Sequence, residues 1–123
     1  MHEAPSASAQ TQHRQLLSQL SGILHDLEPI QNQLLELYQK KSQALRKINV
    51  KIIDECGVIE AELTRELQFV LLRRQQLLQS AGQQGLPADS LHDLLLKLDV
   101  PKSEPLFERI AAAQQRSKKL RHE

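Results

Sequence analysis

The fold is decided by residues 34–78, which read LLELYQKKSQALRKINVKIIDECGVIEAELTRELQFVLLRRQQLL. Apolar residues recur in this stretch at steps of three and four, the spacing of a helix that buries one face. Four polar residues interrupt the pattern: Lys41, Asn49, Glu60 and Arg74. Asparagine favours a helix cap over a helix interior, and β-branched residues crowd around Asn49. We therefore predict two long helices, at about 12–47 and 50–80, that form an antiparallel hairpin with its turn at Asn49.

The composition of the whole chain also favours helices over sheets. Leucine and glutamine are the most frequent residues, and aromatic residues make up only 2% of the 123 residues. Leucine and glutamine lose little side-chain freedom in a helix, whereas strands are rich in β-branched and aromatic residues. A chain of this length is one domain and can bury a core without disulfides. We expect an all-α fold, with residues 12–123 forming one helical bundle and residues 1–11 a mobile tail.

The first long helix leaves three structural questions. Its apolar stripe is wider than a two-stranded coiled coil needs, which predicts packing against two neighbours. The spacing stays in phase across Pro29, which favours a kink over a fresh start with proline in the first turn. The spacing also stays in phase across Asn49, from Ile48 to Ile52. The alternative to a hairpin is therefore one continuous helix over about residues 30–80, roughly 75 Å long at 1.5 Å per residue, which needs an oligomer for stability.

The charged residues of the two apolar seams predict the register of the hairpin. A charge on an apolar seam either pairs with an opposite charge or reaches out to solvent. With the turn at Asn49, facing residues lie equally far from it along the chain. An acidic residue lies within about one helical turn of the position that faces each cation, so the expected ion pairs are Lys41 with Glu60, and Arg74 with Asp26 or Glu28. We expect these pairs to fix the antiparallel register more than to add stability.

Two shorter helices are predicted in the last third of the chain. Gly82 is placed to adopt a left-handed conformation and end the second long helix. Ser90 has the spacing of a capping residue for a short helix at about 89–98. Proline at position 105 opens a last helix at about 104–121. Whether this last helix is docked at rest is left open by the sequence.

Apolar side chains outside the seams indicate a surface for a partner. Phe69 and Leu72 fall on another face of the second long helix, which is therefore apolar nearly all round at this end. The last helix has a thin apolar face, which suits reversible docking. We expect this helix to detach, and either to engage an amphipathic client helix itself or to uncover Phe69 and Leu72 for it.

The sequence contains no pattern for catalysis or for a cofactor. The four glycines lack the spacing of a phosphate-binding loop, and no histidine lies three or four residues from another histidine or from Cys56. Cys56 lies on the seam, where a free thiol behaves as a small hydrophobe. A net charge of +1 and the absence of a long apolar run give no general attraction to nucleic acid or membrane. We expect no enzymatic activity, cofactor, metal, nucleic-acid partner or membrane insertion.

Residues 116–122 form a local basic cluster with two interpretations. Cations near the C-terminus of a helix complement the helix dipole. The same cations also suit a docking contact with an acidic protein surface. The sequence alone leaves both interpretations open.

An ordered set of residues resembles the FlgN-like flagellar export chaperones. The set, within about residues 16–98, is Lys41 before Ala44-Leu45, a turn at Asn49, then Glu60, and Arg74 before Leu77-Leu78. Asn49 stands where the family commonly has aspartate. The resemblance implies a small, all-helical, cytoplasmic chaperone that works without ATP. Such a chaperone binds hook-associated proteins of the hook-filament junction before their export and has the export apparatus as a further partner.

The resemblance also implies a location for client binding. In that family the C-terminal amphipathic region is associated with the client. The matching positions here are Leu106, Phe107, Ile110, Ala113 and Leu120. The alternative function is a homo-oligomeric coiled-coil structural or adaptor protein with no export role. Neither interpretation fixes the oligomeric state or the identity of the client.

Overall fold

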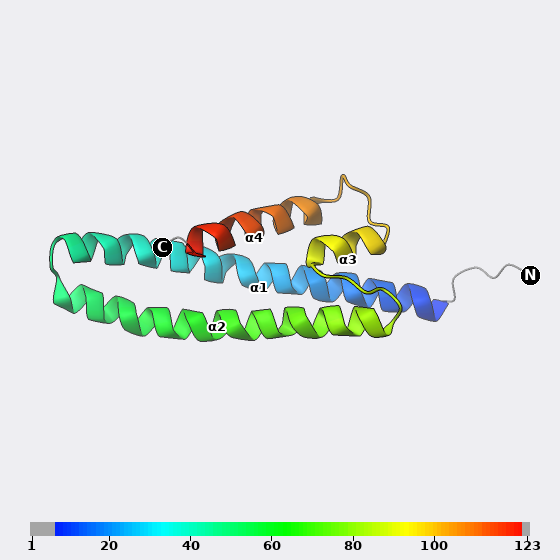
Figure 1. Cartoon of the computed structure of the whole chain (residues 1–123), viewed down its shortest axis with the longest axis horizontal. Helices are drawn as coiled ribbons and strands as arrows, with labels where there is room; N and C mark the ends of the chain where they lie inside the picture. Colours follow the sequence, from blue (N-terminus) through cyan, green and yellow to red (C-terminus); the bar gives the residue numbers. More distant parts are fainter. Residues whose placement is uncertain (1–6, 122–123) are drawn as a thin grey trace, which may run out of the picture.

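The computed structural model describes residues 7–121, whose regular structure is entirely helical (Figure 1). The four helices are α1 (Ala7–Arg46), α2 (Val50–Gln83), α3 (Leu91–Lys97) and α4 (Pro105–Arg121). The expected all-α fold, with two long helices, a short third helix and a C-terminal helix, is confirmed. Helix α1 begins at Ala7 instead of about residue 12, so residues 7–11 of the expected tail are helical. Residues 1–6 of that tail lie outside the described residues.

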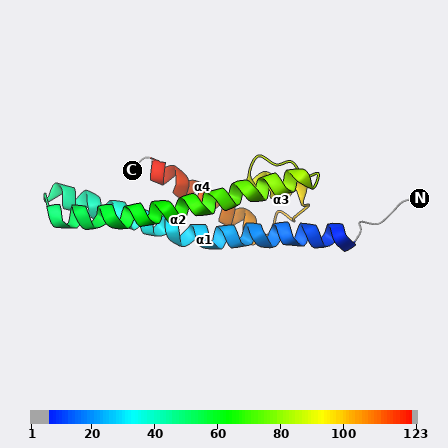
Figure 2. The same ribbon diagram turned by 90° about the horizontal axis from the view of Figure 1, so that it is seen from below.

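Helices α1 and α2 form the predicted antiparallel hairpin. Figure 2 shows them running side by side along the hairpin and crossing at a shallow angle. The chain reverses at Ile48, whose φ of 51° lies in the left-handed region. Asn49 then caps α2, because its side-chain oxygen accepts a hydrogen bond from the backbone N–H of Ile52 at 3.3 Å. The alternative of one continuous helix through Asn49 is therefore wrong.

The core is centred on α1, which is covered on two sides. Along α1, eight apolar residues from Leu16 to Leu37 are buried at helical spacing. Four of the five buried residues of α2 recur every seven positions, at Cys56, Leu63, Val70 and Leu77, and Ala81 follows near the end of the helix. Helix α2 packs mainly on α1, whereas α1 also carries α4. The wide apolar stripe of α1 thus has the two neighbours that its sequence predicts.

Helix α1 continues through Pro29 without a break. Proline removes the helical hydrogen bond to the carbonyl of the residue four positions earlier, which is His25. Both residues are exposed, so water can satisfy that carbonyl. A fresh helix start at Pro29 is therefore excluded.

One of the two expected ion pairs is formed between the expected residues. Lys41 Nζ lies 3.2 Å from Glu60 Oε2. Asp26, however, pairs with Arg73 and not with Arg74. Adjacent helical residues point about 100° apart, and the buried Val70–Leu77 row turns Arg73 toward the side of α1 that carries Asp26. Arg74 points to the other side of the hairpin, toward α4.

Two residues around the loop between α2 and α3 were predicted to mark helix ends, and the structure confirms one of them. Ser90 caps α3 as predicted, with its Oγ accepting a hydrogen bond from the Asp93 N–H at 3.1 Å. The left-handed glycine after α2 is Gly85, at φ 83°, and not the expected Gly82. The N–H of Leu86 donates to the Ala81 carbonyl at 2.8 Å, which satisfies a terminal carbonyl of α2. Helix α3 then buries three leucines, and α4 folds back along α1 (Figure 1).

Candidate functional site

Helix α4 packs on the core through its buried apolar residues and through one buried polar residue of α1, Gln31, which is 1% exposed. Its Nε2 donates to the Ala113 carbonyl at 3.2 Å and to Ser117 Oγ at 2.9 Å. Its Oε1 accepts a hydrogen bond from Arg116 Nε at 2.8 Å. Both ends of a buried amide are thus satisfied by a single neighbouring helix. Helix α4 is therefore docked, in a position that these three bonds specify.

Gln31 was not singled out from the sequence, where the apolar stripe of this helix was traced through its other residues. A signal was nevertheless present. Gln31 lies four residues after Leu27 and three before Leu34, so it falls on the buried stripe of α1. A polar residue at such a position needs a partner, and α4 supplies it.

An open groove runs between α2 and α4, because both helices pack on α1 and meet each other only marginally. We call it the α2–α4 groove. Its floor is formed by Leu24, Leu27 and Leu34 of α1. Its walls are formed by Leu67, Leu71 and Arg74 of α2 and by Ile110, Ala113, Ser117 and Arg121 of α4. Two adjoining cavities within it measure about 380 and 340 Å³.

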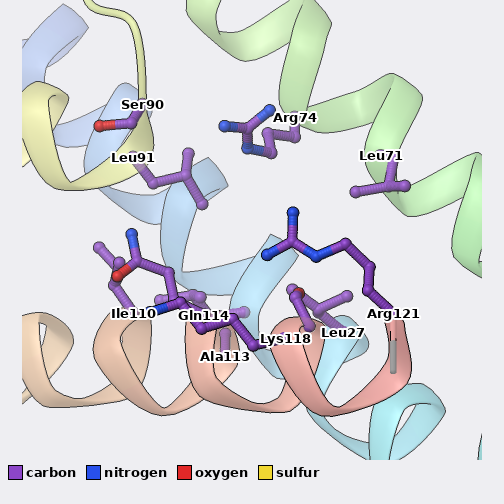
Figure 3. A pocket seen from close by; sticks show the side chains of 12 residues that line it. Leu27, Leu71, Arg74, Ser90, Leu91, Ile110, Ala113, Gln114, Lys118 and Arg121 are labelled. Atoms are coloured by element: carbon purple, nitrogen blue, oxygen red, sulfur yellow. The ribbon is translucent and has the colours of Figure 1, made fainter. Parts of the chain in front are cut away.

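One end of the groove is closed by α3, and its rim is basic. Ser90 and Leu91, at the start of α3, line the closed end. Figure 3 shows Arg74 from α2 and Arg121 from α4 extending into the space between the two helices, with Lys118 beside them on α4. Apolar side chains thus form the bottom of the groove, and cations stand at its edge.

Three of the seven residues expected to bind a client line the groove. They are Ile110, Ala113 and Leu120. Leu106 is buried at 7% exposure. Phe107 is half-buried and stands edge-on to His92, with ring centroids 5.4 Å apart. These last two residues belong to the packing of α4 and not to an open surface.

Phe69 and Leu72 lie outside the groove. They are 65% and 49% exposed while α4 is docked. The expectation that detachment of α4 would uncover them is therefore wrong, because α4 follows the other side of α2. Leu71 lies on that side and lines the groove, although it is almost as exposed as its neighbour Leu72, at 44%. Leu67, Leu71 and Arg74 line the groove from α2, and the sequence analysis did not assign them to binding.

Comparison of the chain with protein-family models, with curated proteins and with solved structures gives no match. Within residues 7–121, none of the helices combines the length and the apolar content that a membrane-spanning helix requires. In the same residues, no group of three or more His, Cys, Asp or Glu side chains is arranged to hold a metal ion.

Proposed function

We propose that this chain is a chaperone that binds an amphipathic helix of a client protein in the α2–α4 groove. The observation that supports this proposal is the open groove between α2 and α4, which both pack on α1, with leucines at its floor. Along α4 the lining runs from Ile110 to Arg121, about 17 Å at 1.5 Å per residue, or about three helical turns. A client helix can place its apolar face on the leucine floor, as in other helix-in-groove complexes.

The client class is the finer part of the proposal. The ordered residues of the hairpin resemble those of the FlgN-like family, which supports a cytoplasmic export chaperone for hook-associated proteins. Such a chaperone keeps an aggregation-prone helix of its client covered until secretion. The helical hairpin followed by two shorter helices suits this role, because it offers a long groove on a small chain.

A second candidate function rests on a different surface. The Asn49 end of the hairpin exposes several large apolar side chains, namely Leu45, Ile48, Val50 and Val58 at 55 to 79% exposure. Apolar surface of this kind favours contact with another protein. A homo-oligomeric structural or adaptor protein would associate through this end. Sedimentation velocity separates the two functions, since the adaptor predicts an elongated oligomer and the chaperone a monomer or compact dimer.

The neighbouring leucines Leu71 and Leu72 provide the test of the groove. Leu71→Gln should weaken binding of a purified hook-associated protein about tenfold, because a buried leucine contributes about 1.5–3 kcal/mol and each 1.4 kcal/mol is about tenfold in affinity. Leu72→Gln is the matched control and should leave affinity unchanged. Isothermal titration calorimetry measures both.

Each outcome of this experiment has a defined meaning. Loss of affinity in Leu72→Gln alone would place the client on the exposed face with Phe69 and contradict the groove. Equal affinity in all three proteins would also contradict it. Failure of every hook-associated protein to bind the unmodified chain would refute the flagellar assignment.

A further inference from the structure

We infer that the α2–α4 groove selects client helices that carry a carboxylate beside their apolar face, and that Arg74 and Arg121 bind this carboxylate from opposite walls. This inference rests on the proposed function, because it names the chemistry of the helix that the groove holds. It assigns a binding role to two cations that the packing of the chain does not explain.

The first observation is the lack of ion-pair partners for the rim cations. Within residues 7–121, Arg74, Lys118 and Arg121 form no ion pair. Arg73, the neighbour of Arg74, is paired with Asp26 on the other side of the hairpin. Arg74 is also half-buried, and its guanidinium has no charged partner in the described part of the chain. A carboxylate from outside would supply that partner.

The second observation is the distribution of acidic residues. The chain has 15 acidic and 16 basic residues, so it is nearly neutral as a whole. In the described part of the chain, however, no aspartate or glutamate lines the groove or its extension along α2. The field inside the groove is therefore positive, and it attracts an acidic segment and disfavours a basic one.

The geometry of the two arginines fits a carboxylate. Figure 3 shows Arg74 and Arg121 reaching into the same opening from α2 and α4, which Leu27 and Leu71 also line. A guanidinium presents a planar fork of donors that matches the two oxygens of a carboxylate. The leucines of the groove exclude water once a client covers them. The attraction between the arginines and the client carboxylate is stronger where water is excluded.

The same surroundings favour a helix over a nucleic acid as the source of the anion. A strand of nucleic acid binds through phosphates and through stacking of its bases on aromatic side chains. Among the described lining residues the only aromatic side chain is Tyr38, and the floor is made of leucine. An amphipathic helix instead offers leucines for the floor and an aspartate or glutamate at the edge of its apolar face for the arginines.

Three helix-constrained peptides of about 18 residues, or five turns, provide the probes. They share one leucine face and carry glutamate, glutamine or lysine at its edge. Fluorescence anisotropy with the full chain should show the glutamate peptide binding about tenfold more tightly than the glutamine peptide, since hydrogen bonds to charged groups are the stronger ones. Arg74→Gln and Arg121→Gln should each weaken the glutamate peptide about fivefold and leave the glutamine peptide unchanged.

Two further variants complete the design. Arg73→Gln is the matched control, because Arg73 lies outside the groove, and it should not change the preference between peptides. Arg74→Glu should reverse the preference toward the lysine peptide, a gain of binding that a misfolded variant does not give.

The outcomes distinguish this inference from the proposed function. Equal binding of the glutamate and glutamine peptides would overturn the carboxylate preference. The groove would still be the binding site if Leu71→Gln weakened both peptides. Failure of all three peptides to bind would overturn both. If Leu71→Gln left peptide binding unchanged and single-stranded RNA displaced the peptide, the ligand of this surface would be a nucleic acid. That result would overturn the inference.

Discussion

Replacement of Gln31 by alanine is expected to weaken the docking of α4 while the hairpin stays folded. The substitution removes all three hydrogen bonds that the Gln31 side chain makes to α4. Ser117 and Arg116 are half-buried and can turn toward water, and the Ala113 carbonyl lies inside a continuous helix. The change therefore costs the net value of the lost bonds and does not leave buried groups without partners.

The loss of docking free energy of α4 can be worked out from these contacts. A net hydrogen bond contributes about 1 kcal/mol, so three contribute about 3 kcal/mol. The lost side-chain methylenes add about 0.8 kcal/mol each where they were fully buried. A loss of 3 kcal/mol raises the ratio of undocked to docked α4 about 150-fold.

Hydrogen exchange followed by mass spectrometry measures this ratio. Peptides from α4 should lose protection by about this factor in Gln31→Ala, while peptides on both sides of Asn49 keep theirs. Gln33→Ala is the control, because Gln33 is an exposed glutamine on the same helix. Unchanged protection of α4, or the same loss in both variants, would refute the view that Gln31 holds the helix.

Three further predictions concern the hairpin and are checked by urea unfolding. Reversing either Lys41 or Glu60 alone should lower the free energy of unfolding by about 0.5–1 kcal/mol, since the pair is one-third exposed, and exchanging both charges should restore it. Ile48→Asn should raise stability by about 1 kcal/mol, because the exposed Ile48 is left-handed and asparagine tolerates that conformation. Asn49→Ala should cost about 1 kcal/mol by removing the cap of α2, while Asn49→Asp, which keeps the acceptor, should cost much less.

The helices and their turns could be predicted because their signals are local. The spacing of leucines sets the two long helices, Asn49 marks the turn, and Ser90 marks the start of α3. Each of these signals depends on residues within one or two helical turns. Local sequence also placed Lys41 within a helical turn of Glu60, because a short distance from the turn leaves little room for error in register.

The groove could not be predicted, because it depends on the side of the hairpin on which α4 packs. The sequence of α4 shows an apolar face but not the neighbour that covers it. Arg74 was predicted as the partner of Asp26, but Arg73 is its partner in the structure. This error also arises because local sequence does not fix how a helix is rotated against its neighbours. A rotation of one residue about α2, set by its buried seven-residue row, decides which arginine pairs and which one enters the groove.

The hairpin extends past the end of α4, and there it consists of α1 and α2 alone (Figure 1). Its seam in that part follows a seven-residue repeat, seen in Cys56 and Leu63. Insertion or deletion of seven residues in each helix would therefore keep every seam contact in phase and move the turn by about 10 Å. Arm length and groove shape are thus separable traits, so evolution or design can adjust the reach of the hairpin without altering the residues that line the α2–α4 groove.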